Sequence, residues 1–359
     1  MQGDRVRQIL SPGLISRGQL GVFPQGRVVE IFYTMTASGI PLLRTEGVGD
    51  VNTVSLPLPK GGLIEVPVIL PEKVQAKLRR ILLAELRRHA GQLPSSEMRS
   101  RLRELGYKRY VGEGEEWNCH ISPPLTEGGT DVGMCGYCPS CVIYGTIIDS
   151  TINEKAATSY GVKSRVAHDV AYGLADYSKA VSELTHNKVG EGVSYTGASL
   201  YSEQHVMPAV VFVGKLALYD ATPSMLHAVT SSLASISRLG GRETIYGAVE
   251  TRIEGVKAGT RETLTSLSVA GKVLEETRGS LAAPEELRER VRGILRENGF
   301  HVEEELVQHL LQPPSLRELW EDAVSLDEKI VEYIMRTRGK AGGSEGRGRG
   351  RQRREQGGE

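Results

Sequence analysis

The sequence lacks the apolar and cysteine patterns of membrane and secreted proteins. No window of its 359 residues approaches about 18 consecutive apolar residues, so we expect no membrane span and no membrane partner. No apolar segment follows a basic start, so we expect no signal peptide. Only four cysteines are present, all within residues 119–141, which argues against a disulfide scaffold and for a reducing compartment. These absences predict a cytoplasmic protein.

The sequence also lacks the short motifs of common enzyme classes. It contains no G-x-x-x-x-G-K-S/T phosphate loop, no G-x-S-x-G nucleophile turn and no H-E-x-x-H zinc motif. His168 and Asp169 form the best acid–base pair, but neighbouring residues on a strand point to opposite faces. We therefore expect a binding protein and not an enzyme.

Net charge is absent too, but only because basic and acidic segments cancel. The chain has 44 Lys and Arg against 44 Asp and Glu. Residues 60–109 contain 12 basic and 5 acidic residues, whereas residues 283–336 contain 13 acidic and 7 basic residues. Such segregation indicates one face for a polyanion and another for solvent or a basic partner.

Strand and helix patterns alternate along the chain, which predicts an α+β fold. Residues 27–36 and 208–219 are rich in β-branched and aromatic residues, as central strands are. A helix over residues 220–237, with Thr222 as N-cap, leads into a strand over residues 243–253. Strand, helix, glycine-rich turn and strand form half of the split βαβ unit that ferredoxin-like and RRM-type domains share. In the first strand, the face expected to meet the core carries Val29, Ile31, Tyr33 and Met35.

Apolar residues at helical spacing predict the remaining helices. One helix spans residues 71–90 and a second begins after Ser95; both carry basic residues and form either a solvated pair or an arm that contacts nucleic acid. Three more are expected in the acidic part of the chain, over residues 284–298, 301–311 and 315–338.

The cysteines form the most specific motif of the sequence. Cys135, Cys138 and Cys141 are separated by two residues each, so one tight loop brings three thiolates together. Zinc takes four such ligands in a tetrahedron, and either Cys119 or its neighbour His120 supplies the fourth. A closed four-ligand site would be structural and would fix a loop-rich insertion that has few apolar residues of its own.

An iron–sulfur cluster is the alternative to zinc at these cysteines. The Cys-x2-Cys-x2-Cys spacing also occurs in bacterial ferredoxins. The fourth cysteine that should follow after three residues is missing, since Gly145 stands there. We therefore favour zinc as the cofactor.

Basic residues near glycines and strand ends are the candidate RNA ligands. Paired glycines let backbone amides approach a phosphate, and flanking guanidiniums add charge. Two plainer explanations stay open, because Gly240 can simply cap a helix and exposed charges are usually solvated. The candidates are Lys163, Arg165, Arg238, Gly240, Gly241, Arg242, Arg252 and Lys257.

Two blocks of the sequence resemble a known family. MCGYCPSCVIYG at residues 134–145 and YGVKSRVAHD at residues 160–169 are similar to the backbone subunit of type I-D CRISPR effector complexes, a RAMP protein of the CRISPR-associated family seven. The glycine-rich turn at residues 240–242 fits the loop that RAMP domains place after a helix. The resemblance covers about residues 27–253, and the cysteine block is its most specific part.

The resemblance implies a modified RRM-like, ferredoxin-like core with inserted helical, lid and zinc-binding subdomains. The implied domains are a core with lid and hairpin insertions (1–70 and 150–280), a helical insertion (71–110), a zinc-binding insertion (111–149), a C-terminal helical segment (281–338) and a disordered Arg-Gly tail (339–359).

The resemblance also implies a function in antiviral defence. Such subunits associate with one another and with other effector subunits along the crRNA, a single-stranded RNA that they bind by its backbone without reading its sequence. Some RAMP backbone subunits cut target RNA with an acidic loop residue. Asp50 is a candidate for that role here, so a metal-dependent RNA nuclease is the alternative function.

Overall fold

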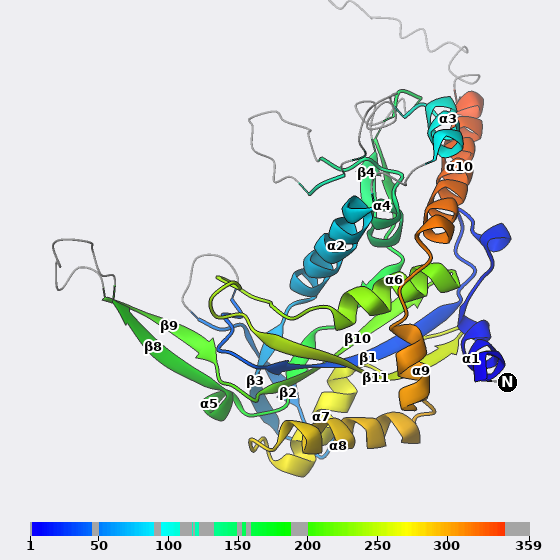
Figure 1. Ribbon diagram of the computed structural model, residues 1–359. Coiled ribbons are helices and arrows are strands. Elements are labelled where there is room, and N and C mark those ends of the chain that lie inside the picture. Colours follow the sequence, from blue (N-terminus) through cyan, green and yellow to red (C-terminus); the bar gives the residue numbers. More distant parts are fainter. Residues whose placement is uncertain are drawn as a thin grey trace, which may run out of the picture.

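One antiparallel sheet organises the molecule (Figure 1). The computed structural model describes residues 2–44, 50–89, 95–107, 117, 119–121, 133–148, 153–155, 159–187 and 200–341. Within them, the strands of the sheet follow the order β11, β1, β10, β7, β3, β2, and β6 pairs with β10. These strands are β1 (Val28–Ala37), β2 (Thr53–Pro57), β3 (Leu63–Ile69), β6 (Val166–His168), β7 (Ala171–Gly173), β10 (Val211–Tyr219) and β11 (Val249–Gly259).

Two hairpins and a set of helices complete the fold. The hairpins pair β4 (Thr146–Ile148) with β5 (Tyr160–Val162) and β8 (Val181–Asn187) with β9 (Leu200–Val206). The helices are α1 (Gln2–Leu10), α2 (Pro71–Arg88), α3 (Ser96–Glu104), α4 (Pro139–Tyr144), α5 (Tyr177–Ala180), α6 (Pro223–Ala234), α7 (Ser266–Thr277), α8 (Pro284–Glu297), α9 (Glu304–Leu310) and α10 (Leu316–Ala341).

The centre of the sheet is a crossover around β1. Both β10 and β11 pair with β1 in antiparallel register, and α6 connects them. The predicted strand–helix–turn–strand order is therefore present, with β1 inserted between its two strands. The predicted cap is confirmed as well, because the Thr222 side chain accepts a hydrogen bond from the Met225 amide at the start of α6.

Both faces of the sheet are covered by helices, which the sequence did not indicate. Every residue of β1 is buried. Val29, Ile31, Tyr33 and Met35 belong to the larger apolar cluster, as predicted, on the side of α2 and α6. Phe32 points the other way, into a second cluster that α7 and α8 complete (Figure 1).

The last predicted strand is wrong in its first half. Residues 242–247 form a turn instead, in which the amides of Ile245 and Tyr246 both donate to the Arg242 carbonyl. Arg242 itself has φ +46°, a left-handed conformation that a strand does not contain. β11 begins only at Val249 and continues to Gly259.

The predicted helices are present with ends shifted by a few residues. Ser95 caps α3, and Pro284 opens α8, as expected from their positions. None of the helices in the part of the chain that the structure covers is long and apolar enough to span a bilayer. Of the predicted Arg-Gly tail, residues 342–359 lie outside the described residues.

Candidate metal centre and basic surface

The four cysteines meet at one point. The Sγ atoms of Cys119, Cys135, Cys138 and Cys141 all lie within 4.8 Å of one another, and all four residues are buried. The Sγ atoms of Cys119 and Cys141 are 3.6 Å apart, far longer than a disulfide bond. A tetrahedral ion with Zn–S bonds of about 2.3 Å separates its sulfur ligands by about 3.8 Å. The spacing of the four sulfur atoms is therefore compatible with one zinc ion.

Local backbone geometry explains the two-residue spacing. Gly133 and Gly136 have φ +64° and +91°, values that side chains disfavour, and they turn the chain on either side of Cys135. Cys138 is the N-cap of α4, so Cys141 lies in the first turn of that helix, on the side of the cluster. This loop is the one that the cysteine spacing predicted.

Cys119, and not His120, completes the cluster. The segment around Cys119 meets the segment around Gly133 where the His120 amide donates a hydrogen bond to the Gly133 carbonyl, at 3.0 Å. The His120 ring then lies against Gly133, where an added Cβ would come within 2.6 Å of it. The alternative that placed His120 in the ligand set is thus not supported, because adjacent residues of an extended segment point to opposite sides.

Burial makes the cluster unfavourable for uncompensated thiolates. Burial raises the pKa of the Cys135 and Cys138 thiols well above the usual value. Hydrogen bonds from the neighbouring thiols lower the pKa of Cys141. A divalent cation would remove this conflict, because it stabilises all four ligands in their deprotonated form.

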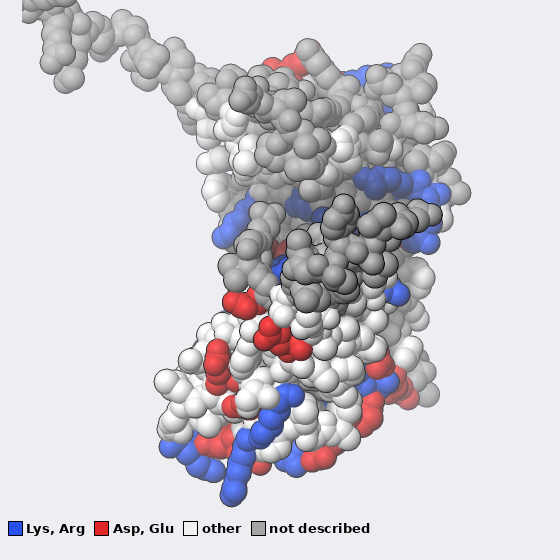
Figure 2. All heavy atoms as spheres, turned by 90° about the vertical axis from the view of Figure 1, so that its left-hand side faces the viewer, with Lys and Arg blue, Asp and Glu red and all other residues white. Residues whose placement is uncertain are grey.

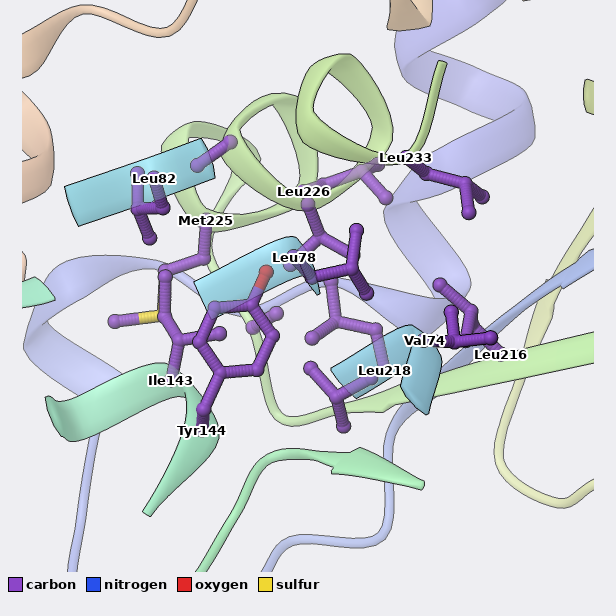
Figure 3. Packing of buried hydrophobic residues seen from close by; sticks show 14 of the residues in the cluster. Val74, Leu78, Leu82, Ile143, Tyr144, Leu216, Leu218, Met225, Leu226 and Leu233 are labelled. Atoms are coloured by element: carbon purple, nitrogen blue, oxygen red, sulfur yellow. The ribbon is translucent and has the colours of Figure 1, made fainter. Parts of the chain in front are cut away.

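Aromatic rings surround the cluster and connect it to the rest of the molecule. Trp117 packs edge-on against Trp320 of α10, with ring centroids 5.3 Å apart. Tyr137 packs in the same way against Tyr107, at 5.0 Å. Ile143 and other residues of α4 lie against α2, α6 and β10 (Figure 3). The insertion therefore shares one apolar cluster with the core.

Two arginines of the predicted basic helix hold this insertion. Arg79, which is buried, donates to the Gly145 carbonyl and lies 5.8 Å from the centre of the Tyr144 ring. Arg87 donates to the Cys119 carbonyl at 2.6 Å. Part of the positive charge in residues 60–109 thus stabilises the contact between α2 and the segment that carries the cysteine cluster.

Asp327 of α10 is a buried carboxyl beside the cluster. Its Oδ1 accepts a hydrogen bond from Tyr107 Oη at 2.6 Å, and Oδ2 has no partner. Burial raises the pKa of Asp327 to about 8. The side chain therefore holds its proton to higher pH than an exposed aspartate does.

We expect Asp327→Asn to flatten the dependence of stability on pH. The pKa of Asp327 in the folded protein, about 8, lies above its ordinary value of 3.8. The protonated Asp327 side chain therefore contributes its full stabilisation below about pH 4, and this stabilisation is lost as the pH rises through about 8. The free energy of unfolding should fall by up to about 1.4 kcal/mol per pH unit in that range. Urea titrations at several pH values test this. Glu332→Gln, at the exposed surface of the same helix, should keep the wild-type slope. Parallel profiles for Asp327→Asn and wild type would contradict the assignment.

The predicted RNA ligands have different local surroundings. Lys163 is exposed, whereas Arg165 is mostly buried and donates to the carbonyls of Asp220 and Gly21, at 2.6 and 3.4 Å. Arg238 donates to the carbonyls of Glu243 and Thr244 in the glycine-rich turn. The structure places Lys163 and Arg165 at one cavity, and the glycine-rich turn does not line that cavity.

The glycine-rich turn has a carboxylate partner that the sequence did not reveal. Gly240 has φ +101° and packs on the Leu42 carbonyl, and the Gly241 amide donates to that carbonyl. Glu203 of β9, 4% exposed, lies 3.1 Å from Arg242 and 2.8 Å from Arg44. No sequence pattern links positions 44, 203 and 242, so only the fold could show that Glu203 pairs with both arginines.

The last two candidates are also engaged in contacts. Arg252 forms ion pairs with Glu250 and Glu285. Lys257 donates to the Asn298 carbonyl and lies 5.4 Å from the centre of the Phe300 ring. Both residues connect β11 to α8 and the segment that follows it.

The alternative catalytic residues are not assembled. His168 is half-buried, its two buried ring nitrogens have no hydrogen-bond partner, and burial lowers its pKa to about 4. Asp169 faces Lys215, 3.7 Å away. Asp50 is exposed, and residues 45–49 beside it lie outside the described residues. Among the described residues, the four cysteines are the one group with the geometry of a metal site.

Basic side chains nevertheless gather on part of the surface. Figure 2 shows Lys and Arg in a band across the upper half of one face, whereas acidic and basic side chains mix in the lower half.

Comparisons with known proteins give one family. The family model described as Csc2 Crispr matches residues 14–311. The crystal structure of Thermofilum pendens Csc2 is similar with a TM-score of 0.72 and 31% identity, over 93% of this chain and 98% of that one. A chain described as CRISPR RNA-guided surveillance complex, pre-nicking, has a TM-score of 0.46 and 13% identity over 75% of this chain and 88% of that one. No curated protein matches the chain.

Proposed function

Because the chain belongs to the Csc2 CRISPR family, we propose that it is a repeated backbone subunit of a type I-D CRISPR surveillance complex. In this role it binds the guide RNA, associates with further copies of itself along that RNA, and contacts other effector subunits in the cytoplasm. The observation that carries the proposal is the family match over residues 14–311, together with 31% identity to a Csc2 protein over 93% of the chain.

The proposed binding mode is through loops and edges, not through the open face of a sheet. The β10–α6–β11 crossover around β1 supports an RRM-like core. In RRM domains, aromatic side chains on the sheet stack on bases. Here helices cover both faces, and Tyr33 is fully buried. Stacking on β1 is therefore not part of the proposal.

We propose that the cysteine cluster binds zinc and has a structural role. Four protein ligands complete a tetrahedron and leave no position for a reactive water molecule. This argues against the metal-dependent nuclease at the cysteines. Elemental analysis of the purified protein should find about one zinc per chain, and a coloured protein with iron would contradict it.

RNA binding should depend steeply on salt and little on sequence. A protein that contacts about four phosphates of a single strand should lose roughly 50-fold in affinity between about 50 and 200 mM salt. Anisotropy titrations with two unrelated single-stranded RNAs at both salt concentrations measure this. Lys163→Ala and Arg242→Ala should each weaken binding without unfolding the protein, whereas Lys272→Ala, an exposed lysine of α7, should not.

Two results would count against the proposal. Tight preference for one of the RNAs would indicate sequence reading, and absence of binding at low salt would remove the RNA-binding role. Intact RNA after long incubation is also expected, for the wild type and for Asp50→Ala alike; cleavage that Asp50→Ala abolishes would favour the nuclease.

A further inference from the structure

A cavity lies between the N-terminal loop, the β5–β6 region and α10. Its volume is about 710 Å³, within the range of pockets that bind small molecules. It belongs neither to the cysteine cluster nor to the glycine-rich turn. Most of its wall is apolar, formed by Val22, Pro24, Val162, Val166, Leu326 and Ile330.

The charged residues of the cavity favour an anion. Lys163 and Arg165 both line it, together with Asp220. The Asp220 carboxylate accepts hydrogen bonds from the amides of Gln25 and Arg27, at 2.9 and 3.0 Å. Asp220 is the one carboxylate among the lining residues, and its charge also acts on Arg165. The lining therefore carries one more cation than anion.

Arg165 is held in place by the protein before any ligand binds. Its guanidinium donates to the carbonyls of Asp220 and Gly21, so its direction is fixed by two separate segments. Burial lowers its pKa, although the charge of Asp220 opposes this at longer range. A phosphate nearby would compensate the buried charge that the carbonyl groups only solvate.

The wall opposite is fixed by α10. Lys329 of α10 donates to the carbonyls of Gly18 and Leu20 and so attaches the N-terminal loop to the helix. Phe23, in the same loop, is 67% exposed and packs edge-on against Tyr333, with ring centroids 5.2 Å apart. Phe23 lies between Val22 and Pro24, which both line the cavity, so its exposed ring is a surface on which a neighbouring base can stack.

We propose that this cavity binds one nucleotide of the RNA, with the base against the apolar wall and the phosphate on Lys163 and Arg165. The inference rests on the proposed function and adds a defined position for one base. A nucleotide combines a flat, weakly polar ring with a phosphate, which matches a wall of this kind with two cations at one side. An acidic peptide would match the cations but leaves the aromatic pair without a role.

The test combines a blocked cavity with an RNA that lacks bases. Ala167 lines the cavity and is exposed, so Ala167→Trp fills the space without disturbing buried packing. We expect Ala167→Trp to weaken binding of a single-stranded RNA about tenfold. The wild type should bind an RNA of the same length with abasic positions about tenfold more weakly than it binds ordinary RNA. The Ala167→Trp variant should bind the abasic RNA and the ordinary RNA with the same affinity, because its cavity is already filled.

Matched variants separate this site from general charge and general folding. Leu63→Trp places the same ring on β3, away from the cavity, and should bind RNA like the wild type. Lys163→Glu should weaken binding about tenfold or more, whereas Lys272→Glu on α7 should not. If Ala167→Trp does not fold, Lys163→Glu and the abasic RNA still test the proposal.

The outcomes distinguish this site from the proposed function. If Ala167→Trp and the abasic RNA both bind as tightly as their references, no base enters the cavity, although RNA binding itself stands. If Ala167→Trp binds RNA normally but no longer assembles with the other effector subunits, a protein segment occupies the cavity and the proposal is wrong. If the wild type binds no RNA, both the site and the proposed function fail.

Discussion

Cys138→Ser should release the metal and destabilise the whole molecule. A structural zinc site supplies about 10–16 kcal/mol in small peptides. Loss of one of four ligands should cost at least about a quarter of this, or ~3 kcal/mol. For a chain of 359 residues such a loss corresponds to a fall in melting temperature of roughly 4 °C. Differential scanning calorimetry with metal analysis of the same sample measures both effects.

The expected extent of unfolding follows from the packing. The sequence indicates an insertion that the metal merely fixes, so loss of metal would leave the core folded. In the structure, however, Cys119, Cys135, Cys138 and Cys141 belong to the same apolar cluster as β1, α2 and α6. Trp117 and Trp320 extend that cluster to α10. We therefore expect one cooperative transition at lower temperature, and not a separate melting of the insertion.

A neighbouring serine provides the control. Ser140 lies between the same cysteines, and its buried hydroxyl has no hydrogen-bond partner. Ser140→Ala removes no hydrogen bond, so metal content should stay unchanged and the melting temperature should not fall. A full equivalent of metal in Cys138→Ser would show that the cluster is not the metal site. Loss of metal without a change in melting temperature would show that the site is dispensable for folding.

Arg288→Met should be the most damaging substitution outside the metal centre. Arg288 of α8 is 1% exposed and lies 2.6 Å from Glu285 and 3.7 Å from Glu254. Glu254 is itself fully buried, and removing one partner of a buried ion pair costs about 3–5 kcal/mol because the other charge stays behind. Arg292, which also pairs with Glu254 at 2.7 Å, should keep the loss near the lower end, ~3 kcal/mol.

The effect of this substitution should depend on pH. Burial raises the pKa of Glu254 above the ordinary 4.5, despite its hydrogen bonds to Thr34 and Arg292. A raised folded pKa means that this contribution to stability is present below the unfolded value and is lost as the pH rises. Without Arg288 the pKa rises further, so urea unfolding should show a larger loss at pH 7 than near pH 4.5.

The same substitution on the exposed side of α8 is the matched control. Arg290 pairs with Glu276 and Glu286 at the surface, where ion pairs contribute little. Arg290→Met should therefore leave stability nearly unchanged. An equal loss in the free energy of unfolding for Arg288→Met and Arg290→Met would contradict the role of Arg288 as the partner of a buried charge. Adding Glu254→Gln to Arg288→Met should recover part of the loss, since the unpaired charge is removed.

Short-range features of the fold could be predicted from the sequence. The N-caps at Ser95 and Thr222, the proline that opens α8, and the loop formed by Cys135, Cys138 and Cys141 all depend on residues within one or two turns of each other. Local hydrogen bonds and spacing determine such features, so the chain specifies them without its tertiary contacts.

The strand after α6 begins later than the sequence predicts, because a contact with a distant segment decides where it starts. Residues 243–246 have strand-like composition, but Gly240 and Arg242 adopt left-handed conformations that fold the chain into a turn. The turn is supported by the Leu42 carbonyl, which lies far away in the sequence. Propensity is weaker than a tertiary contact of this kind, so the prediction failed there.

By itself, the sequence determined the elements, the three-cysteine loop, the segregation of charge and the family resemblance. Only the tertiary structure decided that Cys119 and not His120 completes the cluster, that helices cover both faces of the sheet, and that Glu203 pairs with Arg242. It also placed Lys163 and Arg165 at one apolar cavity. The physical reason is that burial and pairing depend on side chains far apart in the sequence, such as Arg17 and Asp322, and no local pattern encodes which of them meet.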